Sequence, residues 1–139
     1  MSEELKEELS LLPKGLLHLE AGIQSLREPV LEKSRRMGKL SDALDGLRFL
    51  CALPNMETHA DLIAGLPLYH LHEIFEDVRT LAEYAAGEIQ LESLKLLPGT
   101  EMRRRAEESG IKYSPLPPYE VLQTHEINVS ELQTARQLS

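Results

Sequence analysis

The chain has 139 residues, a formal net charge of −8 at pH 7 and one cysteine, Cys51. This length predicts one domain, residues 1–139, with a sizeable hydrophobic core. The negative charge argues against nucleic-acid binding, because a polyanion is bound by a basic surface. The single cysteine excludes an internal disulfide, favours a reducing compartment and is expected to be a small core residue. No apolar run approaches the roughly 20 residues of a membrane span, so we expect a soluble, cytoplasmic protein.

The predicted elements alternate between helix and strand. A first helix is expected at residues 2–12, with Ser2 as its N-cap. Strands are predicted at residues 16–24, 58–65 and 88–96. Further helices are predicted at residues 28–37, 41–53 (capped by Ser41), 71–86 (stopped by Gly87) and 101–109 (capped by Thr100). This order predicts an α/β fold with about three parallel strands and flanking helices.

Residues 111–139 are expected to form an extension of loop and helix. A short extended piece at residues 111–113 precedes a proline-rich loop at residues 114–118. The last helix is predicted to begin near Asn128, with Glu131 as its capping-box partner.

The carboxyl ends of parallel strands are where such sheets bind ligands. The first strand ends at Gln24 and Ser25, and the second ends at Gly65 and Leu66. Gly65 has no Cβ, so the backbone can approach a bulky group there. No GxGxxG or Walker sequence follows these strands, so an ordinary nucleotide-binding fold is not indicated.

Polar side chains share one face of the first two strands. Glu20 lies on that face of the first strand, and His59 and Asp61 lie on that face of the second. We predict that these three face the substrate in a cleft or barrel lumen; alternatively, they only bond to neighbouring backbone or line a wet cleft. No catalytic residue and no metal ligand is predicted. His70 and His72 are expected to be a surface pair, because residues two apart do not share a helix face.

Four segments in order resemble a known enzyme family. They are EAGIQS (20–25), DLIAGLP (61–67), IQLESLKLLPGTEM (89–102) and SPLPPYEVLQT (114–124). They resemble the C-terminal half of a radical S-adenosylmethionine (SAM) domain of the cobalamin-binding group. Many members of that group are labelled anaerobic magnesium-protoporphyrin IX monomethyl ester oxidative cyclase. The resemblance covers nearly the whole chain and implies a fragment of a partial TIM-like (β/α) barrel, its fourth to sixth strands.

The resemblance also implies a partial SAM site. Gln24 and Ser25 correspond to contacts with the methionine or ribose part of SAM. Ile63 and Gly65 match the pattern that cradles adenine, with Leu66 beside them, although Asp61, Leu68 and Tyr69 depart from that pattern. An apolar backbone contact to adenine falls on Leu94 or Leu96.

The CxxxCxxC loop that holds the [4Fe–4S] cluster in this family has no counterpart in the 139 residues. The resemblance therefore implies an oxidoreductase fragment that is inactive alone and whose partner is the N-terminal half of its own parent protein. A tetrapyrrole is one candidate substrate, and the cluster and any cobalamin belong to the parent. The alternative is a stand-alone α/β binding or interaction module without catalysis. In either case open strand edges predict a homo-oligomer.

Overall fold

The computed structural model describes residues 1–84 and 88–138. Its strands are β1 (His18–Gln24), β2 (Glu57–Ala64), β3 (Glu88–Ser93), β4 (Lys112–Tyr113) and β5 (Val121–Gln123). Its helices are α1 (Glu3–Leu11), α2 (Glu28–Lys33), α3 (Leu40–Cys51), α4 (Leu71–Tyr84), α5 (Glu101–Arg104) and α6 (Val129–Arg136). None of the helices in this described part is long and apolar enough to cross a membrane.

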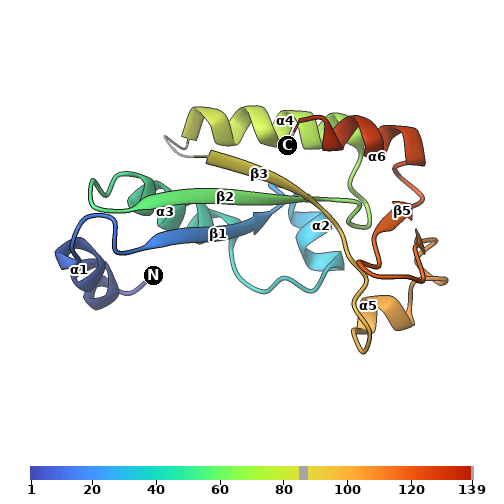
Figure 1. The fold of residues 1–139 in the computed structure, drawn as a ribbon, viewed down its shortest axis with the longest axis horizontal. Helices are drawn as coiled ribbons and strands as arrows, with labels where there is room; N and C mark the ends of the chain where they lie inside the picture. Colours follow the sequence, from blue (N-terminus) through green and yellow to red (C-terminus); the bar gives the residue numbers. More distant parts are fainter. Residues whose placement is uncertain (85–87, 139) are drawn as a thin grey trace.

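The first three strands form one parallel sheet in the order β1-β2-β3, as Figure 1 shows. The register places Ala60 of β2 between Ala21 of β1 and Ile89 of β3. A bulge between Gly22 and Gln24 interrupts the pairing of β1 near its end. The sheet is open, with β1 and β3 on its two sides, and the predicted α/β class with three parallel strands is confirmed.

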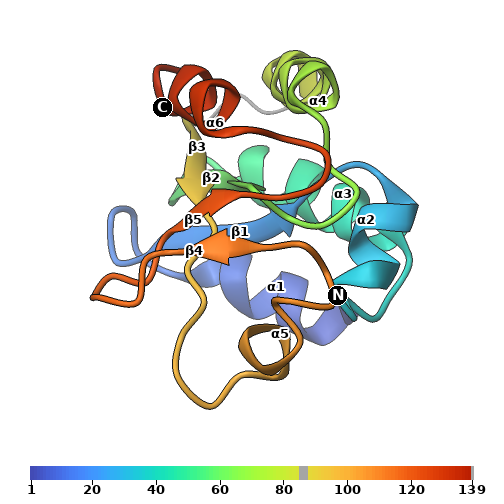
Figure 2. The ribbon, with the colours of Figure 1, turned by 90° about the vertical axis from the view of Figure 1, so that its right-hand side faces the viewer.

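Helices cover the apolar face of this sheet. Ala60 and Leu62 of β2 are fully buried, and Leu47 of α3 and Ile74 of α4 lie in the same core. Figure 2 shows α2, α3 and α4 along this side of the sheet. Burying each large aliphatic side chain contributes about 1.5–3 kcal/mol, so this layer supplies much of the favourable free energy of folding.

The opposite face of the sheet is polar. Strand alternation places His59 and Asp61 of β2 on it, next to Glu20 of β1 and Glu92 of β3. The side chains on the outer strands are exposed, whereas those on the central strand are largely covered by their neighbours.

The C-terminal segment covers the carboxyl ends of the strands. Beyond β3 the chain stays extended, and the amide of Leu94 donates to the carbonyl of Ala64. The amide of Val121 then donates to the carbonyl of Leu94, and Lys95 forms an antiparallel bridge with Glu120. α6 lies beside α4 and against β3 (Figures 1 and 2).

Several predicted helix ends differ from the structure. α2 ends at Lys33 instead of residue 37, because Arg35 follows with a φ of +56°, outside the helical region. α3 begins one residue early, with Lys39 as N-cap, so that Ser41 lies inside the helix and does not cap it. α5 ends at Arg104 instead of residue 109.

The side-chain caps predicted at three helix starts are present. Ser2 accepts from the amide of Leu5, and Thr100 accepts from the amide of Arg103. Asn128 and Glu131 form the complete capping box at the start of α6. The end of the helix predicted at residues 71–86, and its stop at Gly87, lie outside the described residues.

Candidate functional site

The three residues predicted to face the substrate come together on the polar face of the sheet. Glu20 of β1 pairs in register with His59 of β2, and Asp61 follows two residues later on the same face. One ligand-type atom from each side chain lies within 4.8 Å of the other two. We call Glu20, His59 and Asp61 the acidic-imidazole cluster.

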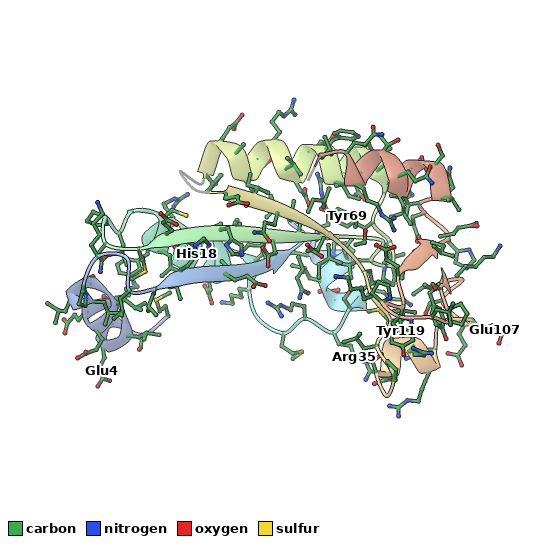
Figure 3. All side chains as sticks on the ribbon, viewed as in Figure 1. Glu4, His18, Arg35, Tyr69, Glu107 and Tyr119 are labelled. Atoms are coloured by element: carbon green, nitrogen blue, oxygen red, sulfur yellow. The ribbon has the colours of Figure 1, made fainter. Side chains whose placement is uncertain are left out.

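His59 is at the centre of this cluster. Its Nε2 atom lies 3.5 Å from Oδ1 of Asp61 and 4.0 Å from Oε2 of Glu20. On the other side of the ring, its Nδ1 atom lies 2.6 Å from Nε2 of His18. His18, labelled on β1 in Figure 3, in turn has its Nδ1 atom 3.4 Å from Oε2 of Glu57. Two imidazoles therefore connect an exposed carboxylate to a buried one.

Asp61 has unusual surroundings for a carboxylate. Only 7% of the residue is exposed. Its Oδ1 atom is buried and accepts no hydrogen bond from the described residues. Burial, together with hydrogen bonding and charge repulsion from Glu20, raises the pKa of Asp61 from an ordinary 3.8 to about 6, while His59 opposes the shift. This carboxyl group can therefore exchange a proton near neutral pH, or its charge can be balanced by a cation.

The residues that the resemblance assigns to SAM divide into two groups. Gln24, Ile63 and Leu94 are partly accessible, and Gln24 has a φ of +70° at the end of β1. The others are closed off by the chain itself. These are Ser25, Gly65 and Leu66.

Gly65 is enclosed by apolar side chains. A Cβ atom added there would lie 3.3 Å from Cγ1 of Val121 and 3.6 Å from both Leu132 and Leu94. The space that the resemblance gives to adenine at this glycine is therefore filled by β5 and α6. Of the residues that the resemblance assigns to SAM, Gln24, Ile63 and Leu94 are the ones that remain accessible to a ligand.

The hydroxyl group of Ser25 belongs to a buried network centred on Asp77. Ser25 is 0% exposed, and its Oγ donates to Oδ2 of Asp77 at 3.2 Å. The amide of Leu26 and the hydroxyl of Tyr69 donate to the same oxygen, each at 2.7 Å. Nε of Arg27 donates to Oδ1 at 2.9 Å. The network fixes the turn after β1 onto α4.

Sequence reasoning missed this network, although α4 carried a signal for it. Asp77 lies three residues after Ile74 and four before Leu81, on the apolar stripe that faces the core. A charged residue on such a stripe is expected to have buried partners. The partners themselves come from segments more than 40 residues away or from the loop before α4 and could not be named in advance.

A small pocket lies beside the end of β2. It has a volume of about 170 Å³ and is lined by Pro67, residues 33–35 and α5 with the turn after it. Its wall carries three basic side chains, Lys33, Arg35 and Arg105, and one acidic side chain, Glu101, which forms ion pairs with both arginines. The lining therefore carries more positive than negative charge.

Two other predicted features have simple surroundings. His70 and His72 are exposed at the start of α4, with ring centroids 5.6 Å apart. Cys51 is half-buried at the end of α3 and packs against the core.

The chain was compared with protein-family models and with curated proteins. No family model and no curated protein matches it.

Proposed function

We propose that this chain is part of a radical SAM oxidoreductase and supplies part of its SAM-binding and substrate-facing barrel wall. Support comes from the sheet: three parallel strands in consecutive order carry helices on one face and the acidic-imidazole cluster on the other. In a (β/α) barrel the helices lie outside and the opposite strand face lines the interior, where ligands bind at the carboxyl ends. The four sequence segments that resemble the family follow one another along this same sheet and its C-terminal cover.

We assign the proposed roles to residues that a ligand can reach. Gln24, Ile63 and Leu94 would contact SAM, and Glu20, His59 and Asp61 would face the substrate. The [4Fe–4S] cluster would be held by the N-terminal half of the parent protein, which we propose as the main partner. A tetrapyrrole is the substrate class that the resemblance implies, in the reaction of a magnesium-protoporphyrin IX monomethyl ester oxidative cyclase.

The gene provides the first test. We expect the DNA upstream of the Met1 codon to continue in frame and to encode a CxxxCxxC motif. With only Cys51 among the 139 residues, the chain alone cannot hold the cluster that reduces SAM. We therefore expect no 5′-deoxyadenosine from the isolated chain under anaerobic reducing conditions, and its detection would contradict the proposal.

Ligand binding provides the second test. S-adenosylhomocysteine, added at millimolar concentration to the ¹⁵N-labelled chain, is expected to shift the amide signals of Gln24, Ile63 and Leu94. Gln24→Ala is the matched variant, and it should reduce these shifts. Shifts confined to other regions, or no shifts in a chain whose gene lacks the upstream motif, would overturn the proposal.

One observation favours a second candidate function. The end of β2 is enclosed by Val121 and Leu132, so the chain covers its own strand ends. This is the arrangement expected of a free-standing α/β binding or interaction module. A gene that begins at Met1, together with unchanged amide signals in the presence of S-adenosylhomocysteine, would favour this candidate.

A further inference from the structure

The acidic-imidazole cluster has the dimensions of a metal site. First-row cations bind imidazole nitrogen and carboxylate oxygen at about 2.0–2.2 Å, which in a tetrahedral site places neighbouring ligand atoms about 3.3–3.6 Å apart. Nε2 of His59 lies 3.5 Å from Oδ1 of Asp61 and 4.0 Å from Oε2 of Glu20. A cation between them therefore requires the carboxylate of Glu20, whose side chain is 68% exposed, to move closer to the other two ligands.

A second observation points to a missing cation. Oδ1 of Asp61 is buried and has no hydrogen-bond donor among the described residues, although nine-tenths of the side chain is covered. Leaving a buried acceptor unsatisfied costs about 1–3 kcal/mol, and more when the group is charged. This oxygen is the atom of Asp61 that faces Nε2 of His59, so the unsatisfied atom points into the cluster.

The hydrogen bond behind His59 prepares its ring for metal binding. A metal-bound histidine donates its second ring N–H to a neighbouring acceptor, which fixes the tautomer. If Nδ1 of His59 donates to Nε2 of His18, the lone pair of His59 Nε2 points into the cluster. His18 then carries its proton on Nδ1, the atom that faces the carboxylate of Glu57. His18 and Glu57 thus form an outer shell behind His59.

We propose that Glu20, His59 and Asp61 bind one divalent first-row transition-metal cation of the Zn²⁺ or Co²⁺ type. The two carboxylates balance its charge, and three protein ligands leave a fourth position for water or another oxygen ligand, as in catalytic zinc sites. An imidazole ligand favours these cations over Mg²⁺ and Ca²⁺, which prefer oxygen ligands alone. This inference does not rest on the proposed SAM function.

The sequence could not indicate this site by spacing. Glu20 and His59 are 39 positions apart and meet only because β1 and β2 pair in the observed register. The exposed His70–His72 pair is the rival place for a metal ion and therefore supplies the matched control.

The test is a titration of the metal-free chain with Co²⁺ and Zn²⁺ at pH 7.5. We expect one Co²⁺ per chain with the visible absorption of a tetrahedral site, and displacement of that signal by Zn²⁺ but not by a hundredfold excess of Mg²⁺. Asp61→Asn and His59→Ala should each weaken Zn²⁺ binding more than about 100-fold. His18→Ala, which changes only the outer shell, should weaken it about 10–100-fold. The double variant H70A/H72A should bind as the unchanged chain does.

Three results would overturn the proposal. The first is the absence of stoichiometric Co²⁺ or Zn²⁺ binding by a chain whose circular dichroism shows it folded. The second is binding that persists in Asp61→Asn, a nearly isosteric change that removes a buried charge and is expected to leave the fold intact. The third is loss of binding in H70A/H72A with the cluster unchanged.

Discussion

Asp61 and Asp77 are two buried aspartates with opposite surroundings. Asp77 accepts from the hydroxyls of Ser25 and Tyr69, from the amide of Leu26 and from the guanidinium of Arg27. Asp61 has one oxygen, Oδ1, for which the described part of the chain supplies no donor, and it has two acidic neighbours, Glu20 and Glu92. A buried carboxylate with a full set of donors stabilises the fold, whereas one without donors is expected to have a ligand or a proton in its place.

Replacing Asp77 tests the first of these roles. We expect Asp77→Asn to lower the free energy of unfolding by about 2–3 kcal/mol, because an amide loses the charge and turns an N–H group toward donors. The measurement is urea denaturation followed by circular dichroism. Glu76→Gln is the control, since Glu76 contacts the same Arg27 but is half exposed, and it should cost less than about 1 kcal/mol. Equal losses in the two variants would show that the network around Asp77 is not stabilising.

The raised pKa of Asp61 predicts a pH dependence of stability. The folded chain holds the proton of Asp61 more tightly than the unfolded chain, so its contribution is fully present below about pH 4 and is lost as the pH rises through about 6. Glu20, His59 and Glu92 are the charged or ionisable groups that face this carboxyl group. Between pH 4 and 7 the unchanged chain should lose about 2–3 kcal/mol relative to Asp61→Asn.

The check is a comparison of urea midpoints for the two proteins across this range, with a chelator present. Other ionisable groups titrate in both proteins, so only the difference between them is informative. A difference that stays constant from pH 4 to 7 would show that Asp61 has an ordinary pKa.

At the scale of single residues, the sequence predicted which side chains share a face of the sheet but not which of their atoms are in contact. Strand alternation placed Glu20, His59 and Asp61 on one side, because the period of a strand is two. The contact between His18 and His59 depends on the register of β1 against β2, which pairs His18 with Glu57 and Glu20 with His59. Ser25 is buried against Asp77, which lies 52 residues later on α4, and this burial was not predictable from the sequence around Ser25.

At the scale of elements, the end of β2 is the most constrained part of the sheet. Gly65 has a φ of +92° and is enclosed by side chains of β5, α6 and the segment after β3. Two effects therefore oppose any other residue there, the backbone conformation and the lack of space.

The two effects can be separated with two glycines. We expect Gly65→Ala to destabilise the chain by about 2–3 kcal/mol, because alanine is strained at positive φ and its Cβ crowds Val121. Gly99 has a similar φ of +85° but no atom within 4 Å of its added Cβ, so Gly99→Ala should cost only about 1 kcal/mol. Chemical denaturation of both variants measures the difference, and equal costs would mean that Val121 and Leu132 do not close the strand end.

The capping box of α6 offers another comparison between elements. Asn128→Ala should cost about 1 kcal/mol, because α6 buries Leu132 and Ala135 and its first turn loses a cap. Ser2→Ala removes the equivalent cap of α1, which has no fully buried residue, and should change global stability by less than about 0.5 kcal/mol. Thermal unfolding and amide exchange in α6 would detect the difference, and a larger loss from Ser2→Ala would contradict it.

Helix starts were predictable from the sequence because a cap is a local feature. Ser2, Thr100 and Asn128 each accept from a backbone amide three residues ahead. Helix ends were less predictable. α2 ends at Lys33, shortly before Arg35 adopts a positive φ, and no glycine in the sequence marks this position. The pairing of residues 119–121 with residues 94–96 joins segments that no local pattern connects.

At the scale of the whole molecule, the sheet is an open arc of three strands with one polar face. β1 ends the sheet on one side, so its outer backbone groups are available to another strand. We expect the isolated chain to form dimers or larger oligomers through this edge. Sedimentation velocity at about 10 and 500 μM should show an increase in mass, and a monomer at both concentrations would contradict the prediction.

The cover over the strand ends has a consequence for synthesis. Gly65 leaves the ribosome well before Val121 and Leu132, which close the space around it. At about 5–20 residues per second this interval lasts several seconds. During that time the nascent sheet exposes an apolar hollow at the end of β2, which is the kind of surface that chaperones bind. The fold is therefore completed late in synthesis. Until then, the solubility of the growing chain depends on how the apolar hollow is covered.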